Sequence, residues 1–310
     1  MFTIDSFSPV PERLRGAFLA VGNFDGVHRG HAHLIGRLRA LADSAGCLAI
    51  ALTFDPPPVA VLRPEQAPAP LTWTARKVEL LQLAGVDEVG TFQTGPWLLG
   101  LTAREFFDRV ILEQFAARGM VEGPTFGFGR DRGGDAQLLG DWCSEAGLEF
   151  EIAQPSEINS RIVSSSRVRV ALAEGRVEEV TKLLGRPHRL RGLIVKGAGR
   201  GAGIGFATAN LDGIDTQIPA DGVYAAQAWL DGESQARPAA VHIGPNATFG
   251  EVTRSVEVHL IDYPGGPLYD RRMIVDLLLC LRPSRKFEGM EDLRAQIRRD
   301  VDQARVIASG

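Results

Sequence analysis

The hydrophobic pattern of this chain changes near residues 185–188, and that change limits the folds open to it. Before this point, continuous apolar runs alternate with amphipathic segments of helical period. After it, short runs of alternating apolar and polar residues are separated by turns rich in Gly, Pro and Asp. The first pattern is typical of a parallel α/β sheet and the second of a small antiparallel barrel. We therefore expect two domains, residues 1–184 and 189–310, joined by a linker and unrelated by any internal repeat.

Five segments of the first domain are predicted as strands because they are short, apolar and bounded by turn residues. Amphipathic segments lie between them, such as residues 74–84, and Thr102 with Glu105 forms a capping box before another helix. Strands that alternate with helices predict a parallel sheet, which binds ligands outside the carboxyl ends of its strands. The predicted strands are residues 17–21, 47–54, 86–92, 119–122 and 148–152.

The stretch VGNFDGVHRGHAHL, residues 21–34, follows the first of these strands. Its glycines allow a tight turn, and the helix after it directs N–H groups and the positive end of its dipole toward an anion. His28 and His31, at the start of that helix, can stabilise charge on phosphate oxygens during a transfer reaction. The alternative is a pair of surface histidines, but the flanking turn and helix favour a functional site.

Other segments of the first domain have features of ligand-binding loops. The proline run at residues 55–58 and the loop GPTFGFGRDRGG, residues 123–134, fall at the same edge of the predicted sheet. Serines 164–166 precede a helix that carries Arg167 and Arg169. Hydroxyl groups, arginines and a helix N-terminus together predict a second phosphate cradle, although a capped surface helix would have the same sequence.

The second domain shows five alternating runs and then one helical segment, residues 290–307. This order predicts an antiparallel barrel followed by a C-terminal helix. The predicted strands are residues 190–196, 222–230, 239–243, 255–261 and 273–279.

The chemically distinctive part of the second domain is KGAGRGAGIGFATANL, residues 196–211. Its alternate glycines leave one side bare, so that the backbone can lie against phosphates, unless the stretch is only a flexible linker. Thr208 and Asn210 follow with hard oxygen ligands suited to Mg²⁺. Glu257, flanked by two valines, points to the opposite face of its strand and is either a general base or a solvated carboxylate on the barrel exterior.

Composition and charge exclude several classes of protein. The net charge of −4 provides no field for general nucleic-acid binding. Three separated cysteines, with no C-x-x-C pair, indicate reduced thiols rather than disulfides or a zinc site. The sequence shows no signal peptide and no membrane-spanning run. We expect a cytoplasmic protein with small-molecule substrates, no nucleic-acid partner and no membrane partner; the oligomeric state is open.

With these motifs in view, the whole chain resembles the bacterial bifunctional riboflavin kinase/FMN adenylyltransferase family, also called FAD synthetase. The resemblance implies an α/β Rossmann-like nucleotidyltransferase domain with a parallel sheet, then a small antiparallel β-barrel riboflavin kinase domain with a C-terminal helix. The motifs that carry it are GNFDGVHRGH at residues 22–31, SSSR at 164–167, GFATAN at 205–210, DGVY at 221–224, VE at 256–257 and KF at 286–287.

Two linked reactions are implied by this resemblance. The second domain would phosphorylate riboflavin with ATP to give FMN, with Mg²⁺ held by Thr208 and Asn210 and with Glu257 as base. The first domain would transfer AMP from ATP to FMN, giving FAD and pyrophosphate, with His28 and His31 at the transferred group. The implied nucleotide-binding residues are Gly22, Phe24, Asp25, Gly30, Ser164, Ser165, Arg167, Gly199, Gly201 and Gly205, and the flavin-binding ones are Phe54, Pro57, Thr125, Phe126 and Phe128.

Four positions depart from the family pattern. Ala207 and Ala247 stand where prolines are usual, Pro57 where a histidine is usual and Thr125 where an aspartate is usual. The first two changes loosen loops beside the metal ligands, and the other two touch flavin placement. Two alternatives therefore stand beside the bifunctional enzyme: a chain in which only one domain is active, and a flavin- or nucleotide-binding regulatory protein without turnover.

Overall fold

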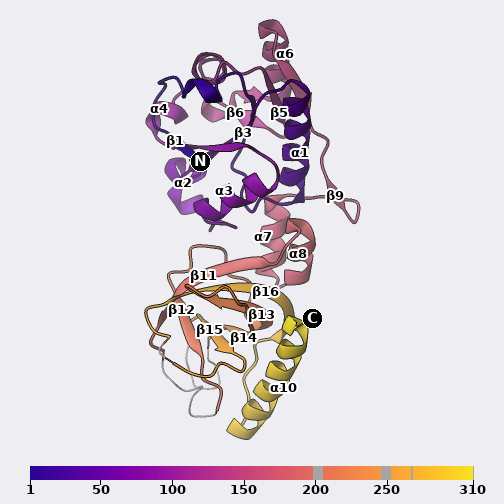
Figure 1. The fold of residues 1–310 in the computed structure, drawn as a ribbon. Coiled ribbons are helices and arrows are strands. Elements are labelled where there is room, and N and C mark those ends of the chain that lie inside the picture. Colours follow the sequence, from indigo (N-terminus) through magenta and orange to yellow (C-terminus); the bar gives the residue numbers. More distant parts are fainter. Residues whose placement is uncertain (198–204, 246–252, 267, 310) are drawn as a thin grey trace. The chain divides into compact units, whose positions relative to one another are not determined.

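The computed structural model describes residues 1–310 except 198–204, 246–252, 267 and 310. It divides into two compact units (Figure 1). The first contains Met1–Pro68 and Thr72–Val163, and the second contains Ala69–Leu71 and Ser164–Gly310. The predicted domain boundary at residues 184–189 stays a prediction. The two helices just before it, residues 165–173 and 177–184, group with the second compact unit.

The core of the first unit is a six-stranded parallel sheet, as the alternation of strands and helices predicts. The strand order is β1-β4-β3-β2-β5-β8. The first strand was missed because three residues are too few to show a period. The strands are β1 Phe2–Ile4, β2 Phe18–Val21, β3 Ala49–Asp55, β4 Glu88–Gln93, β5 Gly119–Glu122 and β8 Glu149–Ile152.

Helices cover both faces of this sheet because successive strand residues point to opposite sides. Phe18 and Ala20 of β2 pack with α1 (Arg29–Ser44) and α3 (Thr74–Leu83) on one face. Leu19 and Val21 point to the other face, toward the helices after β4 and β5. The remaining elements are η1 Glu12–Leu14, α2 Pro58–Leu62, η2 Pro64–Gln66, α4 Pro96–Leu99, α5 Ala103–Phe106, η3 Phe107–Gln114, β6 Gly127–Phe128, η4 Arg130–Arg132, β7 Gly134–Asp135, α6 Ala136–Ala146, β9 Glu157–Ile158 and β10 Arg161–Ile162.

The second unit contains a closed six-stranded barrel with a long helix along its side (Figure 1). The barrel and the C-terminal helix confirm the predicted fold class. One short strand, β12, was not predicted because it directly follows the glycine-rich segment. In chain order the elements are α7 Ser165–Ala173, α8 Val177–Leu184, β11 His188–Val195, β12 Ala209–Asp212, β13 Gly222–Leu230, β14 Arg237–Gly244, β15 Ser255–Leu260, β16 Arg272–Pro283 and α10 Met290–Ser309.

Gln217, in the loop before β13, joins three parts of the second unit. Its backbone N–H donates to the carbonyl of Pro70 at 2.8 Å, and its side-chain amide donates to the carbonyl of Arg169 on α7 at 2.9 Å. Its carbonyl lies 2.8 Å from Nε2 of His188. His188, expected in a linker, is therefore the buried first residue of β11. These bonds attach residues 69–71 and α7 to the barrel.

Candidate active sites

A tight turn connects β2 to α1 at the carboxyl edge of the sheet. Phe24, Gly26 and Val27 all have positive φ, which for a phenylalanine and a valine requires support from their surroundings. That support includes a bond from the Gly26 N–H to the Thr72 hydroxyl at 3.1 Å. Gly22 avoids a tight contact in this turn, since a Cβ there would lie 3.2 Å from the Phe24 ring. The predicted turn residues thus lie together, with Asp25 half-buried among them.

The two predicted histidines lie at the N-terminus of α1. His28 is the N-cap, and its Nδ1 accepts a bond from the backbone N–H of His31 at 3.2 Å. The two imidazole rings stack with centroids 3.6 Å apart, and His31 meets the edge of Phe24 at 5.3 Å. Gly30 permits this packing, since a Cβ there would lie 3.1 Å from the His28 ring. Both imidazoles are thereby held beside the positive end of the helix.

Two buried ionisable residues at this edge were missed from the sequence. Glu122, the last residue of β5, accepts the N–H of Val21 at 2.7 Å, and burial raises its pKa well above the usual value. Lys77 of α3 donates to the Thr53 hydroxyl at 3.5 Å. Burial lowers the pKa of Lys77, while the charges of Asp25 and Asp55 oppose that shift. The only signal in the sequence was a charged residue within each apolar pattern.

Aromatic side chains gather on the other face of the sheet, where flavin contacts were expected. Phe126 and Phe128 stack at 5.4 Å, and Phe54 stacks on Phe92 at the same distance. All four belong to one hydrophobic cluster. The other two predicted flavin residues lie in loops: Pro57 is the N-cap of α2, and the carbonyl of Thr125 accepts from Arg132 at 3.1 Å.

The predicted phosphate cradle, formed by the serines from Ser164 onward, lies at the start of the main segment of the second unit. Ser164 is the N-cap of α7, and its hydroxyl accepts the N–H of Arg167 at 3.2 Å. Ser165 is the first residue of this helix. The Arg167 guanidinium donates through Nε and Nη2 to Oε1 of Glu179 on α8, at 3.1 and 3.0 Å. Arg167 is thus oriented by a carboxylate that the sequence did not reveal as its partner.

Thr208, Asn210 and Glu257 come together on the barrel. The Thr208 hydroxyl donates to Oε2 of Glu257 at 3.1 Å, and Asn210 of β12 lies directly opposite Glu257 of β15. The Ser255 hydroxyl lies 3.4 Å from Oε1 of the same carboxylate. The carbonyl of Ala207 is fixed by Nδ1 of His259 at 2.8 Å. A hydroxyl, an amide and a carboxylate therefore form one polar cluster at the paired strands β12 and β15.

The glycine-rich segment contacts this polar cluster at Gly197, the last described residue before the gap at 198–204. A Cβ on Gly197 would lie only 2.0 Å from Nδ2 of Asn210, so the missing side chain makes room for the amide. Gly205 has a φ of +90°, which favours glycine. The predicted nucleotide-binding residues Gly199 and Gly201, and the altered position Ala247, lie outside the described residues.

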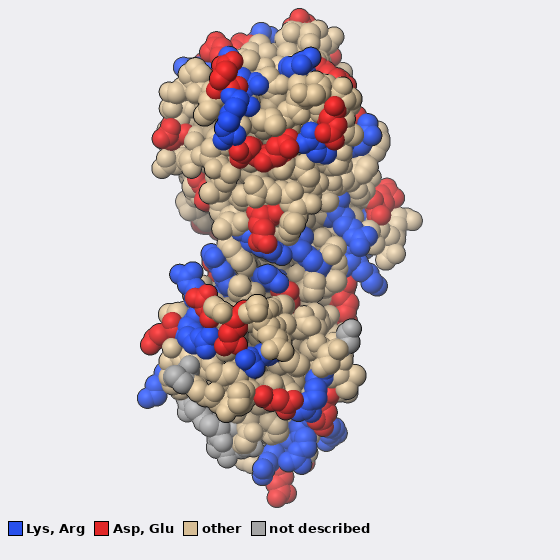
Figure 2. Space-filling model, in the orientation of Figure 1, with Lys and Arg blue, Asp and Glu red and all other residues tan. Residues whose placement is uncertain are grey.

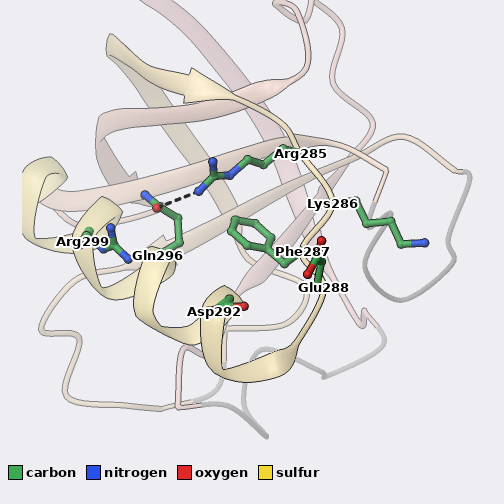
Figure 3. Close-up of a pocket in the computed structure, with 7 residues that line it drawn as sticks. All are labelled: Arg285, Lys286, Phe287, Glu288, Asp292, Gln296 and Arg299. Carbon is green, nitrogen blue, oxygen red and sulfur yellow. Dashed lines mark hydrogen bonds between the residues drawn. The ribbon is translucent and has the colours of Figure 1, made fainter.

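A cavity of about 270 Å³ lies between the segment after β16 and helix α10. Figure 3 shows the Phe287 ring facing this space, with Arg285 hydrogen-bonded to Gln296 at 3.2 Å. Sequence reasoning singled out only two of its lining residues, through the motif KF. The lining residues are Arg285, Lys286, Phe287, Glu288, Asp292, Gln296 and Arg299.

The charges visible in Figure 2 are mixed on each unit, with acidic and basic side chains interspersed. Among the described residues, no group of three or more His, Cys, Asp and Glu side chains could hold a metal ion. In the same part of the chain, no helix is both long and apolar enough to cross a membrane. The three cysteines are all free thiols.

Comparisons with known proteins identify each part of the chain. A family model described as FAD synthetase matches residues 10–167, and one described as riboflavin kinase matches residues 184–308. The chain is therefore an enzyme that joins a nucleotidyltransferase to a kinase. It belongs to the bifunctional riboflavin kinase/FMN adenylyltransferase family.

Relatives of that description match almost end to end. The protein from Pseudomonas fluorescens is 36% identical over 95% of this chain and 94% of its own length. The one from Escherichia coli K12 is 33% identical over 97% and 95%. A crystal structure described as a macrolide-efflux protein from Streptococcus pneumoniae has a TM-score of 0.85 and 30% identity, covering 98% of both chains. That printed description differs from those of both family models and of the curated relatives, which agree on FAD biosynthesis.

Proposed function

We propose that the two reactions occur at the two groups of residues described above, one on the sheet and one on the barrel. The observation that carries this proposal is the assembly of Thr208, Asn210 and Glu257 within the second unit, whereas the histidine pair belongs to the first unit. Riboflavin, FMN and ATP are the small-molecule substrates, and FMN is the product of one site and the substrate of the other. The cytoplasm, where these substrates are available, is the proposed location.

At the barrel site, Glu257 accepts the proton of the riboflavin 5′-hydroxyl as that oxygen attacks the γ-phosphate of ATP, releasing ADP. Thr208 donates its own hydrogen to Glu257, so its oxygen lone pairs remain available. Thr208 and Asn210 offer the hard oxygen donors that Mg²⁺ prefers, and no cluster of three or more acidic side chains that could form an all-protein cage is found among the described residues. Bound Mg²⁺ would neutralise charge on the ATP phosphates.

At the sheet site, the FMN phosphate attacks the α-phosphate of ATP and pyrophosphate leaves. His28 and His31, held at the start of α1, stabilise the charge that develops on the transferred group. Ser164, Ser165 and Arg167, which belong to the second compact unit, are the proposed ligands of the β- and γ-phosphates of ATP, through the helix N-terminus and the guanidinium. The stacked phenylalanines around Phe54 and Phe126 offer an apolar surface for the flavin ring.

Two substitutions test this assignment in the same polypeptide. We expect Glu257→Ala to abolish FMN formation and to spare FAD formation from supplied FMN, because only the barrel site loses its base. His28→Ala should stop FAD formation while FMN accumulates. Chromatography of the flavins measures both outcomes. Loss of both activities in a folded Glu257→Ala chain, or undiminished FAD synthesis in His28→Ala, would contradict the two-site assignment.

A further inference from the structure

A row of side chains crosses the barrel beside the proposed base. Asn210 lies opposite Glu257, and Glu257 lies opposite His242 of β14. The pairing continues from His242 to Val223 of β13 and from Val223 to Arg282 of β16. Directly paired residues in antiparallel strands point to the same face and have Cβ atoms about 5 Å apart. The His242 imidazole is therefore the side chain next to Glu257 on the side away from Asn210.

This row lies on the outside of the barrel, next to α10. Ala240, two residues before His242, packs with Val301 and Ala304 of that helix in one cluster. The end of the row is fixed there as well, because the Arg282 guanidinium binds the buried Asp300 carboxylate, with Nη2 2.8 Å from Oδ2. Glu257 therefore lies on the outer surface of the barrel, in a row whose other end, Arg282, is held to helix α10.

His242 also connects this row to the segment after β16. Its Nε2 lies 3.3 Å from the Ser284 hydroxyl. Ser284 is followed directly by Arg285, Lys286 and Phe287, which line the cavity in Figure 3. The half-buried imidazole thus lies between the proposed base and the start of a cavity wall.

The pKa of His242 is consistent with a position beside a general base. Burial lowers the pKa of His242; Glu257 and Asp221 oppose that shift, and Arg282 reinforces it. The imidazole is therefore neutral at neutral pH. A neutral neighbour restricts the positions of Glu257 without forming the ion pair that would weaken a carboxylate as a proton acceptor.

We propose that His242 is a positioning residue for riboflavin phosphorylation, which orients the Glu257 carboxylate and links it through Ser284 to the wall of the adjoining cavity. The inference rests on the proposed role of Glu257. A positioning residue acts on the chemical step through the base, so its removal lowers kcat more than it raises KM for either substrate.

The test measures FMN formation over ranges of riboflavin and Mg·ATP. We expect His242→Ala to lower kcat about tenfold with both KM values within about twofold. His242→Gln, whose amide nitrogen reaches the place of Nε2, should restore kcat to within about threefold, and Ser284→Ala should give an intermediate loss. His33→Ala, an exposed histidine on α1, is the matched control. FAD formation from supplied FMN reports the integrity of each variant.

The same substitutions in a Glu257→Gln chain separate positioning from a general structural effect. Without the base, His242→Ala should lower the residual single-turnover rate no further. The proposal is wrong if His242→Ala leaves kcat within about twofold, or if its loss is equally large in the Glu257→Gln chain. Should His242→Ala misfold, an unchanged kcat in Ser284→Ala would overturn it. Full FMN formation by Glu257→Gln alone would instead refute the proposed function of Glu257.

Discussion

Gly197 illustrates how a missing side chain can define a site. A Cβ at this position would overlap the Asn210 amide, whose nearest atom lies at 2.0 Å. We expect Gly197→Ala to displace Asn210 and to lower kcat for FMN formation at least about tenfold, because the proposed Mg²⁺ ligand loses its place. FAD formation from FMN should be unchanged. Gly289→Ala, which adds its methyl to open space, is the control for kinase assays, and equal rates in the two variants would contradict this account.

Glu122 makes a second residue-level prediction, about stability. Its pKa is raised by burial, so the folded state holds a proton that the unfolded state releases as the pH rises above about 4.5. The wild-type chain therefore loses stability with rising pH through this residue. Glu122→Gln keeps an acceptor for the Val21 N–H and removes the titration. Urea unfolding should show the variant gaining stability relative to wild type between pH 5 and pH 8; parallel curves would refute the prediction.

Local motifs made some site residues predictable and left others hidden. His28 and His31 could be placed because a turn, a cap and a helix start lie within one continuous stretch. Glu122 and His242 could not, because their partners Val21 and Glu257 come from other strands. Pairing between distant strands fixes these contacts, and a single sequence contains no direct record of register.

At the scale of elements too, a segment with a complete local pattern could be predicted, and a short segment without one could not. Helix α3, Thr74–Leu83, was predicted within one residue of its observed bounds, because its period is complete and Gly85, with a positive φ, follows it closely. The four residues of β12 follow a glycine-rich stretch and show no period of their own. The barrel strand was therefore missed although its Asn210 was recognised from the motif.

His188 shows how an element end can give the protein a pH-dependent stability. Nε2 faces the Gln217 carbonyl, which can only accept, so Nε2 carries the hydrogen and the buried Nδ1 has no hydrogen-bond partner in the described structure. Burial lowers the pKa of His188 to about 4. The unfolded state thus binds the extra proton below about 6.5, and the folded state only near 4.

Stability should accordingly fall as the pH decreases from about 6.5 to about 4, by at most about 3 kcal/mol from this residue. His188→Gln keeps a donor for the Gln217 carbonyl and removes the titration. Its free energy of unfolding, measured in urea over this pH range, should decrease less steeply than that of the wild type. A wild-type slope preserved in the variant would exclude His188 as the source.

For the whole molecule, the change of hydrophobic pattern predicted both fold types because each depends on a local period. It did not predict how the chain is shared between the compact units. Residues 69–71 join the second unit through Gln217, and α7 does so through Arg169. Such contacts depend on segments far apart in sequence, and they attach the helix with the predicted phosphate ligands to the barrel unit.

The central claim is that one chain performs two reactions in sequence at two sites. It is tested most directly by a chromatographic time course of the purified protein with riboflavin, ATP and Mg²⁺. The account predicts that FMN appears first and that FAD follows after a lag, as FMN leaves the barrel site and is consumed at the sheet site. FMN that accumulates without FAD, or no product from either riboflavin or supplied FMN, would contradict it.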